Sequence, residues 1–157
     1  MPFQVKVFLD ANILFSAARP DSPLRAMVLS LIKRSACVTN SHAVTEAQRN
    51  LASKQPQHSL SGRELIDHIP LDNRYTDPSV GALPEKDKPI LGGAIATHCT
   101  HLLTGDRTHF GSLYGRRING VEVVSPRQLA DQLIQLGCAE RDVERRKQSE
   151  ERRADGG

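Results

Sequence analysis

The stretch VFLDANIL, residues 7–14, decides the fold class of this chain. Its first residues belong to a run that begins at Val5. The run alternates in polarity at first, becomes apolar through Leu9 and is followed by Asp10. That pattern predicts a β-strand over residues 5–9. A carboxylate directly after an apolar strand is an unusual place for an ordinary surface charge. We therefore interpret residues 5–9 as a buried first strand and Asp10 as a candidate functional residue at its carboxyl end.

Strand and helix patterns alternate along the rest of the chain. Short apolar segments predict further strands at residues 36–39, 101–104 and 121–124. Capping residues, prolines and apolar periodicity predict helices that begin near residues 23, 41, 61, 87 and 126. Strands that alternate with helices predict an α/β fold with a mainly parallel sheet.

The C-terminal segment differs in composition from the rest of the chain. The helix that begins near Pro126 is predicted to run to Leu136 and to stop at Gly137. Residues 139–157 then carry six acidic and six basic residues and almost nothing that could enter a core. We predict one domain over residues 1–138, followed by a charged tail over 139–157 that is a frayed helix or disordered.

Length and composition narrow the class of protein. A chain of 157 residues suits one domain, and a net charge of +3 permits a polyanionic partner but is also ordinary for this length. No apolar run approaches the roughly 18 residues of a membrane-spanning helix, and the first residues do not have the pattern of a signal peptide. The three cysteines are odd in number and have no paired spacing. We therefore expect a cytoplasmic protein without membrane contact.

Four acidic residues are expected to meet at one edge of the predicted sheet. Asp10 and Asp106 follow predicted strands, Asp87 begins a predicted helix, and Glu46 lies early in another. In open parallel sheets, ligands bind outside the carboxyl ends of the strands. Clustered carboxylates repel one another unless a cation compensates them, and oxygen ligands favour Mg²⁺ or Mn²⁺. Such ions activate water and stabilise charge on a phosphate, so the cluster predicts phosphodiester hydrolysis.

Each acid taken alone also has a structural explanation. Asp87 could cap a helix, Asp106 could be a turn residue after Gly105, and Glu46 could be a solvated helix residue. The functional interpretation depends on the four acids together.

Four segments of the chain resemble, in order, the motifs of the PIN-domain family, a nuclease domain found in many toxins of bacterial and archaeal toxin–antitoxin systems. The resemblance covers about residues 3–136, while residues 53–84 match nothing diagnostic. The segments are VFLDANIL (7–14), TEA (45–47), KDKPILGGAIA (86–96) and LLTGDRTHF (102–110).

The resemblance implies both a fold and a site. The fold would be a three-layer α/β/α sandwich with a mainly parallel sheet of about five strands, often in a homodimer. Asp10, Glu46, Asp87 and Asp106 would be catalytic ligands of Mg²⁺ or Mn²⁺, with Asn12 and Thr104 in support. The implied activity is a metal-dependent ribonuclease, closest to the toxin branch of the family, with RNA as substrate and an antitoxin as partner.

Other interpretations were weighed against this one. Arg107, Arg116 and Arg117 follow the fourth acid and could contact RNA phosphates, although a solvated loop explains them as well. His109 could assist proton transfer, but such a residue more often packs or hydrogen-bonds, so it is left out of the catalytic set.

The rival functions come from different classes. A phosphatase of the haloacid-dehalogenase type needs a second Asp two residues after the first, and Asn12 stands there and cannot transfer the proton. An RNA-processing nuclease that is not a toxin, and a degenerate PIN-like module that binds RNA or protein without cutting it, remain open.

Overall fold

A five-stranded sheet forms the centre of the protein, for which a computed structural model describes residues 5–79 and 83–155. The strand order is β2-β1-β3-β5-β4. The first four strands in that order are parallel, and β4 joins the edge antiparallel to β5. The strands are β1 (Val7–Leu9), β2 (Cys37–Val38), β3 (His101–Leu103), β4 (Arg117–Ile118) and β5 (Val121–Val124).

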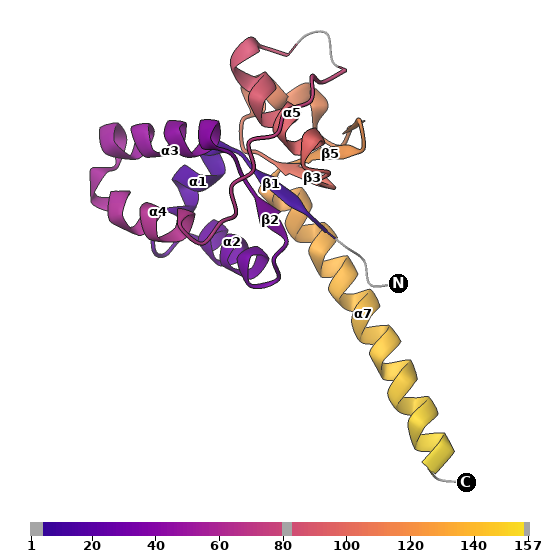
Figure 1. The fold of residues 1–157 in the computed structure, drawn as a ribbon. Helices are drawn as coiled ribbons and strands as arrows, with labels where there is room; N and C mark the ends of the chain where they lie inside the picture. The colour runs from indigo at the N-terminus through magenta and orange to yellow at the C-terminus, as the bar shows by residue number, and fades with distance from the viewer. Residues whose placement is uncertain (1–4, 80–82, 156–157) are drawn as a thin grey trace.

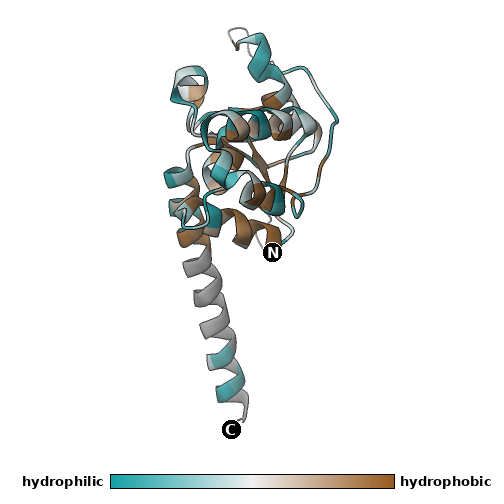
Figure 2. Cartoon of the chain, turned by 90° about the vertical axis from the view of Figure 1, so that its left-hand side faces the viewer, coloured by the Kyte–Doolittle hydropathy of each residue, from teal (hydrophilic) through white to brown (hydrophobic). Residues whose placement is uncertain are grey.

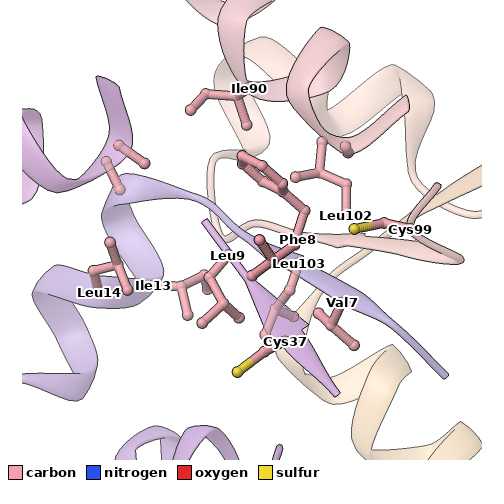
Figure 3. Close-up of a cluster of buried hydrophobic side chains, with 14 of the residues drawn as sticks. Val7, Phe8, Leu9, Ile13, Leu14, Cys37, Ile90, Cys99, Leu102 and Leu103 are labelled. Atoms are coloured by element: carbon pink, nitrogen blue, oxygen red, sulfur yellow. The ribbon is translucent and has the colours of Figure 1, made fainter. Parts of the chain in front are cut away.

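Helices cover both faces of this sheet, so the predicted three-layer α/β/α sandwich with five strands is confirmed. Figure 3 shows Ile90 of α5 above Phe8 on one face, and Ile13 of α1 beside Leu9. Phe8 and Leu9 are adjacent in a strand, so their side chains point to opposite faces. The helices are α1 (Ala11–Ala17), α2 (Pro23–Lys33), α3 (Ser41–Lys54), α4 (Ser59–Ile66), α5 (Lys88–Ala96), α6 (Arg107–Phe110) and α7 (Pro126–Asp155). Short 3₁₀ turns lie at η1 (Pro56–His58), η2 (Glu85–Asp87) and η3 (Gly111–Leu113).

Several helix starts follow the capping signals in the sequence. Ser22 caps α2 by accepting a hydrogen bond from the Leu24 amide at 3.2 Å. The capping box before α7 is reciprocal, because the Ser125 hydroxyl accepts from the Gln128 amide and the Gln128 side chain accepts from the Ser125 amide.

Other boundaries differ from the prediction. Helix α3 is capped by Asn40, whose side chain accepts from the Ala43 amide, and Ser41 is its first residue rather than its cap. Helix α4 begins at Ser59, two residues before the capping box expected at Ser61. Both α1, which begins directly after Asp10, and the two-residue strand β4 were not predicted.

The prediction that the last helix stops at Gly137 is wrong. Helix α7 continues without interruption to Asp155, and its C-terminal half extends away from the rest of the molecule in both views (Figures 1 and 2). Its N-terminal part packs on β5, where Leu129 is fully buried. Within the described residues, no helix combines the length and the apolar character needed to cross a membrane.

Candidate active site

The four predicted acids line one cavity of about 310 Å³. Asp10 follows β1, Asp106 follows β3, Asp87 precedes α5 and Glu46 lies on α3, so the cavity opens at the carboxyl edge of the parallel strands. Its lining residues are Asp10, Ala11, Asn12, Phe15, Glu46, Asn50, Lys54, Lys86, Asp87, Gly105 and Asp106.

Asp10 is buried at the junction of β1 and α1, with 6% of its surface exposed. One carboxylate oxygen accepts from the Ala11 amide at 2.6 Å, and the other accepts from the Thr104 hydroxyl at 2.8 Å. Burial and, to a smaller extent, the charges of Glu46 and Asp87 raise the pKa of this carboxyl from 3.8 to about 6, against the lowering effect of these two hydrogen bonds.

Asn12 and Thr104 connect the first acid to the fourth. The Asn12 side chain accepts from the Gly105 amide at 2.9 Å and donates to the Thr104 hydroxyl oxygen at 3.3 Å. The same hydroxyl oxygen accepts from the Asp106 amide at 3.1 Å. These contacts hold the loop after β3 against the end of β1, which fits the supporting position expected for both residues.

Asp87 occupies the cap position of α5 but does not act as a cap. Its side chain makes no capping hydrogen bond, and its Oδ2 atom is buried without a hydrogen-bond partner. Burial raises the pKa of this carboxyl; His109 and Lys86 lower it, while Asp106 and Glu46 raise it. A buried acceptor of this kind costs free energy unless a ligand satisfies it, so the cap explanation does not account for Asp87.

Asp106 is a cap as well as a cavity residue. Its Oδ1 accepts from the amides of Thr108 and His109, each at 3.1 Å, at the start of α6. Its Oδ2 lies 2.8 Å from Nδ1 of His109, and that nitrogen is also 3.2 Å from Oδ2 of Asp87. The two carboxylates and the imidazole therefore offer three ligand atoms that all lie within 4.8 Å of one another.

The sequence prediction missed the other contributors to this site. His109 is outside the predicted catalytic set because such a residue more often packs or hydrogen-bonds, and only the three-dimensional structure places it between two acids. Lys54 and Lys86 line the cavity beside Glu46, which is exposed. Arg107, Arg116 and Arg117 are exposed and are not among the residues that line the cavity.

The residues present fit a hard divalent cation. The cavity gathers carboxylate oxygens from four separate segments. Burial raises the pKa values of Asp10 and Asp87, so a cation beside them would favour their charged forms. The orphaned Oδ2 of Asp87 is an acceptor that a cation would satisfy. Mg²⁺ and Mn²⁺ take ligands of this type.

The fold and the cavity define a class: a three-layer α/β/α sandwich with an acidic cavity at the carboxyl edge of its sheet. No family model matches the sequence. No curated protein matches it either. Among solved structures, the chain is similar to a chain of VapBC2 from Rickettsia felis bound to a DNA fragment from their promoter, at 16% identity and a TM-score of 0.56. The match covers 77% of this chain and 98% of that one, and it confirms the PIN-like fold.

Proposed function

We propose that this chain is a Mg²⁺- or Mn²⁺-dependent ribonuclease that hydrolyses RNA phosphodiester bonds. The observation that carries the proposal is the convergence of Asp10, Glu46, Asp87 and Asp106 on one cavity, with an unsatisfied buried oxygen on Asp87. Two of the four acids, Asp10 and Asp87, are buried, and keeping them charged beside two further carboxylates costs free energy unless a cation is bound.

Each residue then has a defined part. Asp10, Glu46, Asp87 and Asp106 would hold the ion, and Asn12 and Thr104 would fix Asp10 and the loop that carries Asp106. The bound ion would supply Lewis-acid stabilisation of the phosphate and a water molecule of lowered pKa. Lys54 and Lys86 lie where they could contact the phosphates of an RNA strand in the cavity, and Arg107, Arg116 and Arg117 could extend that contact outside it.

The test is cleavage of a mixed single-stranded RNA with Mg²⁺ or Mn²⁺, with EDTA as the metal-free arm. Asp10→Asn and Asp106→Asn should each lower the rate by at least about 100-fold, and the double variant should add little, because residues that act as one unit are non-additive. Both variants should still bind RNA through basic residues. Asp67→Asn, at an exposed acid outside the cavity, is the matched control and should cut normally.

Cleavage that survives EDTA, or single variants as active as the wild type, would contradict the metal-nuclease proposal. A wild-type protein that binds many RNAs but cuts none would favour the binding module without catalysis.

The biological role that we propose is that of a cytoplasmic toxin with an antitoxin partner, and the family resemblance implies a homodimer. The similar solved structure, VapBC2, is an assembly bound to promoter DNA, which supports a partner protein for this chain as well. Expression of the chain alone should slow the growth of a bacterial host, and Asp10→Asn should relieve the effect. Equal toxicity of both proteins would separate the growth effect from catalysis and favour an RNA-processing role.

A further inference from the structure

His109 lies between two acids of the candidate metal site. Its Nδ1 atom is 2.8 Å from Oδ2 of Asp106 and 3.2 Å from Oδ2 of Asp87. The side chain is about three-quarters buried, so the imidazole is held in the wall of the site rather than in solvent. None of the four sequence motifs assigns it a role in catalysis.

The position of this imidazole is fixed by its own helix. The His109 amide donates to Oδ1 of Asp106, and the next residue, Phe110, is fully buried. Tyr114 donates to the Thr104 carbonyl at 2.9 Å, which holds the end of this segment to the loop after β3. A side chain anchored in this way can present a nitrogen at a defined point with little loss of conformational entropy.

The two contacts of Nδ1 have the spacing of neighbouring ligands around one ion, and all three atoms lie within 4.8 Å of one another. Neighbouring ligands of an octahedral ion at about 2.1 Å are about 3 Å apart. The two contacts of Nδ1, at 2.8 and 3.2 Å, lie on either side of that value. Oδ2 of Asp87 has no hydrogen-bond partner, although it faces the imidazole, so it remains available to an ion placed among the three atoms.

We propose that Nδ1 of His109 is itself a ligand of the ion, together with Asp87 and Asp106, and that this nitrogen makes the site prefer Mn²⁺ over Mg²⁺. The inference rests on the proposed metal site and goes beyond it by naming a fifth ligand and a metal preference. In the metal-bound state Nδ1 carries no proton, and the remaining ring proton is on Nε2. Mg²⁺ favours oxygen ligands and keeps its water. Mn²⁺ also favours oxygen, but as a transition ion it tolerates one imidazole nitrogen among carboxylates better than Mg²⁺ does.

A competing arrangement uses the same contacts differently. In that arrangement Nδ1 is hydrogen-bonded to Asp106 in the metal-free protein, and the imidazole ring turns away from the site when an ion binds. The two arrangements differ in one measurable respect, which is whether a histidine nitrogen is bonded directly to the ion.

The experiment is pulsed electron paramagnetic resonance of the full chain loaded with one equivalent of Mn²⁺, which detects directly coordinated nitrogen. The wild type should show a nitrogen coupling that changes to the ¹⁵N pattern when the histidines are ¹⁵N-labelled. His109→Asn should abolish the coupling, while His68→Asn, at an exposed histidine outside the cavity, should keep it. Titration calorimetry should show Mn²⁺ affinity falling by at least about 10-fold in His109→Asn, with a smaller change for Mg²⁺.

Wild-type protein that binds Mn²⁺ without a nitrogen coupling would overturn this inference and leave the metal site in place. Wild-type protein that binds neither ion would overturn the inference and the proposed function together. Because the labelled wild type answers the question alone, the test does not depend on the folding of His109→Asn.

Discussion

At the scale of single residues, Asp10 is the acid whose burial opposes its charge most strongly. Its pKa in the folded protein is about 6, against 3.8 for an ordinary aspartate, because burial disfavours its charge. A raised folded pKa means that this group stabilises the fold below about pH 4 and that the contribution is lost as the pH rises through 6. The difference corresponds to at most about 3 kcal/mol.

Asp10→Asn should therefore raise the free energy of unfolding of the metal-free protein at pH 8. The amide oxygen can still accept from the Ala11 amide, so the cap of α1 remains. Urea unfolding of both proteins in EDTA at pH 8 and pH 4.5 measures the effect, and the advantage of the variant should shrink at the lower pH. A variant that is less stable than the wild type at pH 8 would show that hydrogen bonding to Thr104 outweighs the burial of charge.

The sequence was sufficient to find the acids but not their neighbours. Asp10 and Asp106 could be located because each follows an apolar strand, and parallel strands bring their carboxyl ends to one edge. His109, Lys54 and Lys86 have no such signal, because a helix surface carries histidines and lysines for many reasons. Their positions depend on the angle at which α3 and α6 meet the sheet, and no local pattern encodes that angle.

At the scale of elements, two glycines let α5 sit where the site needs it. A Cβ on Gly93 would lie 2.9 Å from the Asn40 side chain and 3.1 Å from the Phe8 ring, so this helix is pressed onto the sheet. A Cβ on Gly92 would meet the Tyr75 ring and the Thr76 carbonyl oxygen. The Thr76 amide also donates to the Gly92 carbonyl at 3.1 Å, and this hydrogen bond joins the segment that follows α4 to helix α5.

Gly92→Ala should destabilise the protein by about 1–3 kcal/mol, because the added methyl group overpacks a contact with backbone. Helix propensity alone would favour alanine by about 1 kcal/mol. A loss of stability would therefore show that the close contact of Gly92 with Tyr75 and Thr76 outweighs propensity. Chemical denaturation compared with Gly111→Ala, where a Cβ finds only ordinary contact, is the measurement. Equal or higher stability of Gly92→Ala would mean that the segment carrying Tyr75 yields easily.

Helix α7 shows where element prediction from sequence fails. The four parallel strands and the start of α7 could be predicted, since apolar runs and a capping box are local signals. Gly137 in the sequence predicts a helix stop, yet one glycine costs a helix only about 1 kcal/mol, which flanking helix formers can offset. Strand β4 has two residues and lacked the length that a pattern needs.

Removal of residues 139–157 should leave the folded domain intact. The buried contacts of α7 with β5 involve its first turns, around Leu129, and the removed segment is rich in charge and poor in apolar residues. Thermal unfolding of residues 1–138 beside the full chain should give midpoints within a few degrees of each other. A much lower midpoint, or an insoluble truncated protein, would place the domain boundary beyond residue 138.

At the scale of the whole molecule, the proposed metal site would couple metal binding to the stability of the fold. Four carboxylates on four segments repel one another without an ion, and an ion that binds only the folded state stabilises it by mass action. At a free concentration about 100 times the dissociation constant, the gain is about 2.7 kcal/mol. For a domain of this size that is a rise of about 5–10 °C in Tm.

Mn²⁺ at millimolar concentration should therefore raise the Tm of the wild type, and EDTA should reverse the rise. The shift should be larger at pH 8 than at pH 5, since protons compete for a carboxyl whose pKa is about 6. Asp106→Asn should lose most of the shift, whereas Asp67→Asn should keep it because that acid does not line the cavity. A Tm that changes with neither Mn²⁺ nor Mg²⁺ at pH 8 would contradict the proposed metal site.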